Sequence, residues 1–378
     1  MRILFVLENY WPNVGGVETL FRGAAEELAH RGHKVTVVTS RLSGTPAREE
    51  HGGVIVRRVS VPQPLRRYLF MMLALPVVVR EALRAEIIHT TTYNAAFPAW
   101  IGARVTGRPV IITVHEVFSE QWQRMPGMNP FLGWGYRIYE WVILRLPFRA
   151  YVCDSEFTRK RLLDRTGIDP ARVSKIYPAH DPSLWNRADY VPFPLRSEIG
   201  ASDDAFVYLY FGRPGVSKGV HDLIEAVPLV ADRVFGSRLV MLLSREPADQ
   251  YARILRRVRD LKIEDSVVIL DSVPRQSLPR YLLAANCVVV PSISEGFGYA
   301  ALEAATLGCR VIATAGHSVE EILGDVVTLV PPRNKEKLAG AIADVASGSP
   351  RRTGKPREFT VDAHVDALLE VYRKAGSA

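Results

Sequence analysis

The stretch that decides the fold is residues 287–305, which read CVVVPSISEGFGYAALEAA. Residues 288–290 are valines, which is typical of a short buried strand. A loop with two glycines and Glu295 follows, and the residues after it favour a helix. A strand, a loop and a helix in this order form the building unit of α/β proteins.

The same alternation of short apolar runs and longer amphipathic stretches continues through the whole chain. It predicts strands at residues 3–7, 34–39, 110–114, 151–153, 206–211, 239–243, 267–270, 288–290 and 311–313, and helices at residues 18–30, 220–230, 248–261 and 361–375. This pattern predicts an α/β fold in which each half is a doubly wound, Rossmann-like unit around a parallel sheet. Ligands of such sheets bind beyond the carboxyl ends of the strands, so the residues that follow each strand are the candidates for a site.

The chain length of 378 residues favours two domains rather than one. Four prolines between residues 177 and 194 resist a continuous helix or a central strand, which indicates a connecting segment. We therefore expect an N-terminal domain at residues 1–183, a C-terminal domain at residues 184–358, and a helix within residues 359–378 that returns to the first domain. Two such domains imply a cleft between them.

The net charge of +8 is unevenly distributed. Residues 1–183 contain 24 Lys and Arg against 16 Asp and Glu, whereas the remaining residues contain 24 of each kind. This excess indicates an anionic partner for the N-terminal half. A phosphorylated lipid, an anionic membrane and nucleic acid all fit the sign, but no nucleic-acid-binding motif accompanies the charge, so we expect no nucleic acid.

The N-terminus and the cysteines indicate a cytoplasmic protein. The apolar run after Met1 is too short for a signal peptide. Cys153, Cys287 and Cys309 are an odd number at wide spacings, so we expect reduced, buried thiols and neither a disulfide framework nor a metal site.

Two candidate site positions follow strands in the N-terminal half. Gly15 and Gly16 precede a predicted helix, where backbone N–H groups and the helix dipole favour a phosphate or another anion, although a tight turn also explains paired glycines. His115 directly follows the strand at residues 110–114. A histidine there can donate a hydrogen bond to a sugar hydroxyl or move a proton, although a lone histidine is often structural.

In the C-terminal half, residues 211–219 read FGRPGVSKG between a strand and a helix. This spacing places Arg213 and Lys218 on one short loop with glycines, which suits a diphosphate whose charge grows as it leaves. Surface loops also carry such cations, and the GxxxxGK[ST] phosphate-binding motif is absent.

The strongest signal is the pair Glu295 and Glu303, eight positions apart and about two helical turns. Gly296, Phe297 and Gly298 lie between them, and the glycines free the backbone. Two carboxylates so placed can accept hydrogen bonds from the hexose and the ribose of a nucleotide-sugar, with the two cations on the phosphates between. Stabilisation of a helix start explains Glu295 but leaves Glu303 unexplained.

Together these motifs resemble the retaining glycosyltransferases of family GT4, which have the GT-B fold of two facing Rossmann-like domains, and the resemblance covers nearly the whole chain. It implies that Arg213 and Lys218 bind the donor diphosphate, Glu295 the sugar hydroxyls and Glu303 the ribose. It places Gly15 and Gly16 near donor and acceptor, and His115 near the transferred sugar. It also implies a UDP- or GDP-hexose donor and front-face attack with retention, with no metal and no cofactor.

Two positions depart from the family pattern. Residues 308–311 read GCRV, where family members often have Gly-x-Pro-Val. In the following Gly-Gly-x-x-Glu element, residues 316–320 read GHSVE, so His317 stands in place of a glycine. We expect His317 to crowd the approach of the backbone to the donor.

Two stretches of the N-terminal half combine arginines with apolar residues. In residues 57–84, six arginines surround the apolar run 69–79, which is far shorter than the roughly twenty residues that span a bilayer. Residues 122–148 mix aromatic residues with Arg124, Arg137 and Arg145. These stretches fit core-facing helices with solvated arginines, or contact with lipid headgroups at the inner face of the cell membrane by an enzyme with a lipid-linked or otherwise anionic acceptor.

Two other functions share this architecture. A nucleotide-sugar-binding protein without transfer activity would not need the full set of His115, Arg213, Lys218, Glu295 and Glu303. A nicotinamide-dependent dehydrogenase would carry a GxGxxG fingerprint after the first strand, which is absent.

Overall fold

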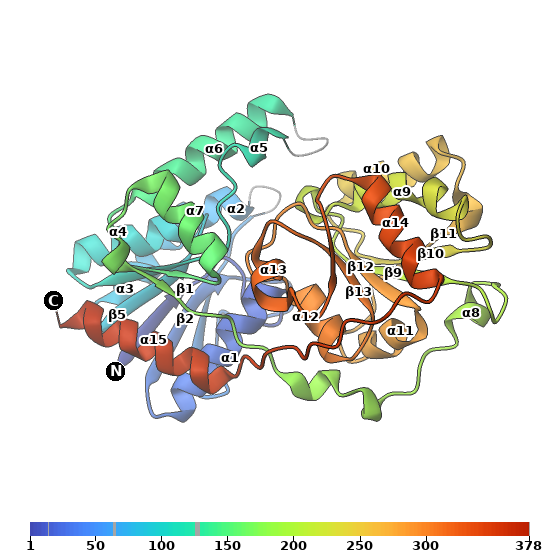
Figure 1. The fold of residues 1–378 in the computed structure, drawn as a ribbon. Helices are drawn as coiled ribbons and strands as arrows, with labels where there is room; N and C mark the ends of the chain where they lie inside the picture. Colours follow the sequence, from blue (N-terminus) through green and yellow to red (C-terminus); the bar gives the residue numbers. More distant parts are fainter. Residues whose placement is uncertain (14, 63–65, 125–128, 378) are drawn as a thin grey trace. The chain divides into compact units, whose positions relative to one another are not determined.

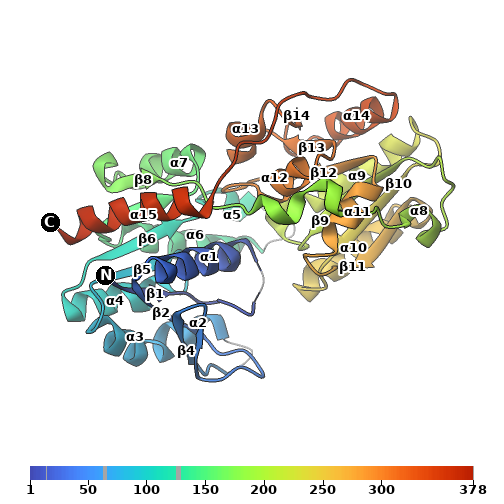
Figure 2. The same ribbon diagram turned by 90° about the horizontal axis from the view of Figure 1, so that it is seen from below.

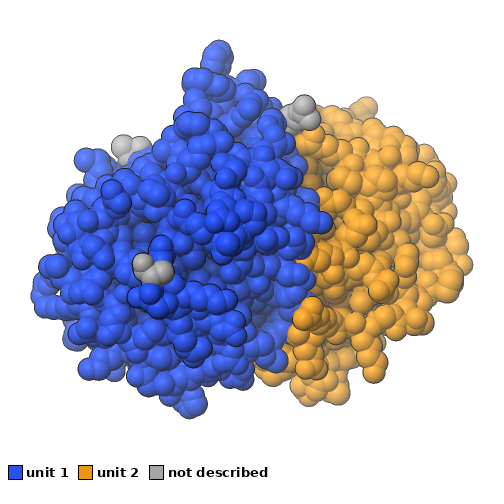
Figure 3. Space-filling model, turned by 60° about the vertical axis from the view of Figure 1, so that its left-hand side comes forward, with its two compact units in different colours: residues 1–124, 129–180, 359–378 blue, residues 125–128, 181–358 orange. Residues whose placement is uncertain are grey.

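The computed structural model describes residues 1–13, 15–62, 66–124 and 129–377. These residues form two compact units, coloured separately in Figure 3. Of the described residues, the first unit contains those up to His180 together with the segment from Phe359 onward, and the second contains residues 181–358. The chain thus enters the second unit after His180, whereas the sequence places this boundary after residue 183.

The first unit is built around one sheet (Figure 1), in which the described residues form eight strands in the order β3-β4-β2-β1-β5-β6-β7-β8. Their bounds are β1 Arg2–Val6, β2 Lys34–Ser40, β3 Arg48–His51, β4 Val54–Val59, β5 Ile87–Thr91, β6 Val110–Val114, β7 Ala150–Cys153 and β8 Val173–Lys175. All neighbouring strands pair in parallel except β3, which runs antiparallel to β4. The prediction of a largely parallel sheet is therefore confirmed for this unit.

Helices cover both faces of this sheet, which explains why its central strands are buried throughout and mostly apolar. The helices are α1 Gly16–His30, α2 Arg66–Leu73, α3 Leu75–Ala82, α4 Ala96–Thr106, α5 Gln121–Arg124, α6 Pro130–Arg145, α7 Glu156–Thr166 and α15 Val361–Gly376. Alternate residues of β1 point to opposite faces: Leu4 and Val6 pack with α3, α4 and α6, and Ile3 and Phe5 pack with α1 and α15.

The C-terminal helix α15 lies beside α1 (Figures 1 and 2). Its apolar side, with Leu368 and Tyr372, is buried as the spacing predicts. The phenol of Tyr372 lies 2.6 Å from Nδ1 of His89, whose Nε2 lies 2.8 Å from Oγ1 of Thr113. Burial lowers the pKa of His89 to about 3, so a neutral imidazole links α15 to the centre of the sheet.

The second unit has a smaller parallel sheet, in which the described residues form six strands in the order β11-β10-β9-β12-β13-β14. The strands are β9 Val207–Gly212, β10 Arg238–Leu243, β11 Val267–Asp271, β12 Cys287–Val290, β13 Val311–Thr314 and β14 Thr328–Val330. The helices are α8 Leu195–Glu198, α9 Val220–Ala231, α10 Ala248–Asp260, α11 Leu278–Ala284, α12 Tyr299–Thr306, α13 Ser318–Leu323 and α14 Lys335–Ala346. The predicted doubly wound architecture is confirmed.

Two further details concern the apolar run 69–79 and the cysteines. The apolar run 69–79 is divided between α2 and α3, because Pro76 lies in the first turn of α3, where its missing N–H is tolerated. Of the three free cysteines, Cys153 and Cys287 are buried as expected, but Cys309 is only partly buried. No helix in the described part of the chain is both long and apolar enough to cross a bilayer.

Candidate active site

Two loops of the second unit bring the main predicted residues together. Lys218 lies after β9 and Glu295 after β12, and these two strands are neighbours in the sheet. Nζ of Lys218 lies 2.7 Å from Oε1 of Glu295. The hydroxyl of Ser292 donates to the same oxygen at 2.7 Å. The structure therefore joins Lys218 and Glu295 in one hydrogen-bonded group.

Glycine is required where these loops meet. Gly219 has a φ of +65°, and an added Cβ would lie 1.8 Å from the carbonyl oxygen of Pro291. Gly298 has a φ of +92°, and its Cβ would lie 2.4 Å from Cγ2 of Val319. The backbone N–H of Ile293 also donates to the carbonyl of Ser217 at 2.7 Å. This close packing fixes both loops relative to each other.

Glu295 is 8% exposed and is held as a carboxylate. Burial opposes ionisation, but the ammonium of Lys218 and the hydrogen bond from Ser292 outweigh it and keep the pKa of Glu295 below its usual value. An ionised carboxylate only accepts hydrogen bonds, so this group can receive hydroxyl donors from a sugar.

Glu303 is also buried, and its partner is Arg275, at 2.5 Å. The guanidinium of Arg275 lies 5.3 Å from the ring centroid of Trp185. Burial raises the pKa of Glu303 to about 7, although Arg275 opposes this. Helix α12 begins at Tyr299, so Glu303 lies about one turn into it, and the expected two turns between the glutamates were wrong.

Arg213 lies on the same loop as Lys218, but its side chain is exposed. Its carbonyl oxygen accepts a hydrogen bond from the phenol of Tyr210 at 3.0 Å. Burial raises the pKa of Tyr210, and the charges of Glu295 and Arg213 act on that phenol in opposite directions. Both charged groups therefore lie in the neighbourhood of Tyr210.

His317 turns into the core. It is 4% exposed, and its Nδ1 accepts from the backbone N–H of Val319 at 3.4 Å. Its Nε2 lies 2.9 Å from Oγ1 of Thr314 and 3.2 Å from the carbonyl oxygen of Ser292. These contacts place the added bulk of His317 beneath the loop of Glu295, where it supports Ser292.

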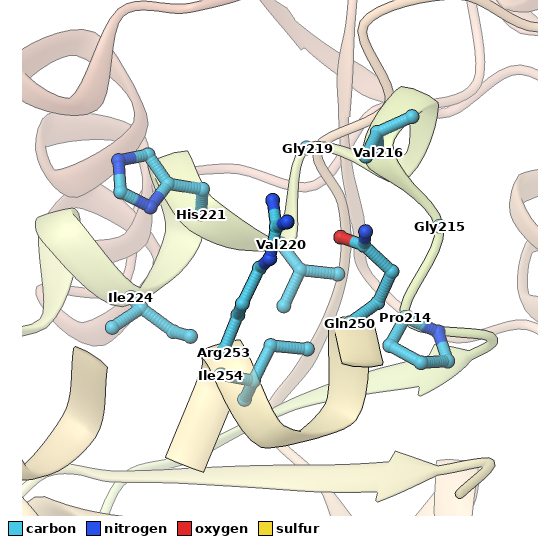
Figure 4. A pocket seen from close by; sticks show the side chains of 10 residues that line it. All are labelled: Pro214, Gly215, Val216, Gly219, Val220, His221, Ile224, Gln250, Arg253 and Ile254. Carbon is cyan, nitrogen blue, oxygen red and sulfur yellow. The ribbon is translucent and has the colours of Figure 1, made fainter. Parts of the chain in front are cut away.

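A pocket of about 290 Å³ borders the loop of Lys218 (Figure 4). Apolar side chains of α9 and α10 line it together with the polar side chains of His221, Gln250 and Arg253. Lys218, Glu295 and Glu303 are not among the described residues that line it. This pocket is therefore separate from the group of Lys218 and Glu295.

In the first unit, His115 follows β6 as predicted and pairs with Asp154, which directly follows the neighbouring strand β7. Nδ1 of His115 lies 2.6 Å from Oδ2 of Asp154. Burial would lower the pKa of His115, but the carboxylate of Asp154 raises it above the usual value, with smaller effects of Glu18 and Glu116. Nε2 of His115 is buried and has no hydrogen-bond partner among the described residues.

Helix α1 begins at Gly16, directly after the N-cap residue Gly15. The carboxylate of Glu18 folds back over Gly15, where an added Cβ would lie 2.3 Å from Oε2. Nδ2 of Asn13 donates to Oε1 of Glu18 at 2.9 Å. Glu18 thus supplies a negative charge at the helix start where the paired glycines predict an anion.

Sequence reasoning missed three residues of these groups: Asp154, Ser292 and Arg275. Asp154 follows a strand, as His115 does, so the rule about strand ends applies to it as well. Arg275 also lies in the loop after a strand, β11. Its partner could not be read from the sequence, because the packing of α12 determines it.

Known sequences resemble this chain over nearly its whole length. The family described as Glycosyltransferase Family 4 matches residues 14–184, and the family described as Glycosyl transferases group 1 matches residues 194–357. A phosphatidylinositol N-acetylglucosaminyltransferase subunit of Arabidopsis thaliana is 26% identical, over 95% of this chain and 77% of its own. D-inositol 3-phosphate glycosyltransferase of Kineococcus radiotolerans is 27% identical, over 96% of this chain and 91% of its own.

Solved structures share the fold. Sucrose-phosphate synthase from Thermosynechococcus elongatus has a TM-score of 0.76 at 20% identity and covers 100% of this chain and 99% of its own. Anabaena HepE in complex with UDP-glucose has a TM-score of 0.74 at 20% identity and covers 99% of this chain and 100% of its own. The two matched families and the shared architecture lead to one assignment: the chain belongs to the group 1, or GT4, glycosyltransferases and has the GT-B fold.

Proposed function

We propose that this glycosyltransferase transfers a hexose from a UDP- or GDP-sugar to an acceptor, with retention at the anomeric carbon. The observation that carries this proposal is the group formed by Lys218, Glu295 and Ser292 at the carboxyl ends of β9 and β12. Lys218 of this group and Arg213 of the same loop carry positive charges that stabilise the departing diphosphate. Glu295 accepts hydrogen bonds from the hexose, with Gly296, Phe297 and Gly298 shaping the loop beside it, and Glu303 accepts from the ribose.

The reaction we propose needs no metal and no cofactor. The growing charge on the leaving diphosphate is matched by two cationic side chains and by backbone N–H groups of the glycine-containing loops. Among the described residues, no three His, Cys, Asp or Glu side chains form a group that suits a metal ion. The acceptor hydroxyl attacks the face of the sugar from which the diphosphate leaves.

In the first unit, His115 offers its free Nε2 to the transferred sugar, and Gly15 and Gly16 lie near donor and acceptor. We propose a lipid-linked or otherwise anionic acceptor at the cytoplasmic face of the membrane. The charge excess of residues 1–183 supports it. So do the names of two relatives, one of which contains phosphatidylinositol and the other inositol 3-phosphate.

Donor turnover tests this proposal. The purified chain is incubated with a panel of UDP- and GDP-hexoses without acceptor, with and without EDTA, and release of the nucleotide is measured. We expect slow hydrolysis of one donor, unaffected by EDTA, and release of the sugar in the donor's anomeric configuration by NMR. Binding of a donor without any hydrolysis or transfer would instead indicate an inactive nucleotide-sugar-binding protein.

Replacing Asp154 by asparagine is expected to shift the pH dependence of turnover. Asp154 raises the pKa of His115, so Asp154→Asn lowers that pKa and moves the alkaline limb of kcat/KM to lower pH. The stabilisation from this pair is present below the ordinary pKa of about 6.5 and is lost as the pH rises through the raised pKa. The Tm difference between wild type and variant should therefore shrink as the pH rises.

The matched control is Asp164→Asn, at an exposed position on α7. It should leave both the pH profile and the Tm unchanged. Identical alkaline limbs in the wild type and Asp154→Asn would contradict a role of this pair in turnover.

A further inference from the structure

Helix α6 turns an apolar face toward the solvent. Phe131, Trp134, Ile138 and Trp141 are spaced three or four residues apart and share one side of the helix. Phe131 is 85%, Trp134 57% and Trp141 54% exposed. A surface helix normally directs its charged residues outward, so this arrangement is the reverse of the usual one.

Helix α2 lies beside α6 and also exposes apolar side chains. Tyr68, Met72 and Leu73 are exposed on it. Side-chain contacts join the two helices: the phenols of Tyr68 and Tyr136 lie 3.4 Å apart, and the phenol oxygen of Tyr139 lies 3.1 Å from Sδ of Met71. We call the combined surface the α2–α6 surface, and its members are Tyr68, Met72, Leu73, Phe131, Leu132, Trp134, Ile138 and Trp141.

The charges around the α2–α6 surface are mostly positive, and the carboxylate of Glu120 beside α6 is paired, with its Oε1 3.7 Å from Nη2 of Arg137. Residues 66–80 contain no acidic residue, and residues 129–149 contain only Glu140. Glu140 is buried and accepts hydrogen bonds from the backbone N–H groups of Phe118 and Ser119 at 2.9 and 2.6 Å, so it faces inward. The guanidinium of Arg145 lies 4.5 Å from the ring centroid of Trp141.

An exposed aromatic face bordered by arginines favours a lipid bilayer as the partner. Tryptophan beside arginine suits the boundary between lipid headgroups and acyl chains, where the ring enters the apolar layer and the guanidinium reaches the phosphates. A second copy of the chain fits less well. In a two-fold dimer the same surface of both copies would meet, so the arginines at its border would lie near each other and repel.

The α2–α6 surface is connected to the edge of the sheet where an acceptor would bind. Tyr139 of α6 donates to Oδ1 of Asn94 at 2.8 Å, and Nδ2 of Asn94 donates to Oε2 of Glu8 at 2.8 Å. Asn94 follows β5 and Glu8 follows β1, so both lie at the carboxyl edge of the sheet, as His115 does.

We propose that the α2–α6 surface seats the first unit on an anionic bilayer, with the aromatic side chains of α6 in the interface. The headgroup of a lipid-linked acceptor would then lie beside the carboxyl edge of the sheet. This inference rests on the proposed function for its purpose, but the binding itself is independent of transfer.

Vesicle flotation tests the proposal. The full chain is mixed at low salt with vesicles of phosphatidylglycerol and phosphatidylcholine, or of phosphatidylcholine alone. We expect the wild type to float with the anionic vesicles, and Trp134→Glu/Trp141→Glu to bind at least about tenfold more weakly. The control Phe235→Glu, at a fully exposed position of the second unit, should bind like the wild type.

Donor hydrolysis without acceptor and the Tm are measured on the same variants, and both should stay at wild-type values. Equal flotation of the wild type and the double variant would overturn the proposal, as would a wild type that fails to float. A wild-type dimer that the double variant dissociates would show that the surface binds a second copy instead. A chain that floats but turns over no donor would contradict the proposed function. It would still support binding of the α2–α6 surface to the bilayer.

Discussion

Replacing Glu295 by glutamine is expected to lower kcat about 10²- to 10³-fold, which is typical of removing one preorganised polar group from a transition state. The carboxylate is buried, shares Oε1 with Lys218 and Ser292, and is kept ionised by that environment. Glutamine keeps the shape but removes the charge that balances Lys218. We expect a smaller change in KM than in kcat, because the sugar hydroxyls need this acceptor most when the glycosidic bond breaks.

The measurement is steady-state hydrolysis or transfer with the best donor. Glu336→Gln, at an exposed position on α14, is the matched control and should turn over like the wild type. A Glu295→Gln enzyme within about threefold of wild-type kcat would show that this carboxylate does not act in the reaction, since a lost polar group in the transition state costs far more.

Replacing Arg275 by methionine is expected to destabilise the second unit by up to about 3 kcal/mol at alkaline pH, where Glu303 would be ionised and the substitution leaves its carboxylate buried without a countercharge. The pKa of Glu303, already raised to about 7, should rise further in the variant. The folded state then binds a proton that the unfolded state releases, so the variant loses stability as the pH rises. The loss should be larger at about pH 8 than at about pH 5.

Urea unfolding of the wild type and Arg275→Met at both pH values checks this prediction. Adding Glu303→Gln to Arg275→Met should restore part of the stability, because it removes the unpaired charge. The control is Arg245→Met, which removes an exposed ion pair to Asp271 and should cost less than about 1 kcal/mol. A pH-independent loss in Arg275→Met would mean that Glu303 is not the cause.

The fold could be read from the sequence wherever a strand is buried on both faces. The run 110–114 corresponds to β6 in full, because both sides of that strand meet helices, which favours apolar residues at most of its positions. The strand order could not be read, since it depends on crossovers between segments far apart in the chain. The division of the apolar run 69–79 into two helices, with Pro76 in the first turn of α3, could not be read from the run itself.

The candidate site was partly predictable for the same reason. Lys218 and Glu295 could be anticipated together because each follows a parallel strand, and such strands end at one edge of the sheet. The pairing of Glu303 with Arg275, and that of His115 with Asp154, depends on side-chain packing that spacing does not encode. The sequence left open whether the aromatic residues of α6 face the core or lipid headgroups, because an apolar helix pattern alone does not separate the two.

The most direct test of the account is a crystal structure of this chain with bound UDP or GDP. We predict that the diphosphate lies within hydrogen-bond distance of Nζ of Lys218 and the guanidinium of Arg213, with the ribose at Glu303. A nucleotide bound instead in the pocket of His221, Gln250 and Arg253, with the contact between Lys218 and Glu295 unchanged, would contradict it.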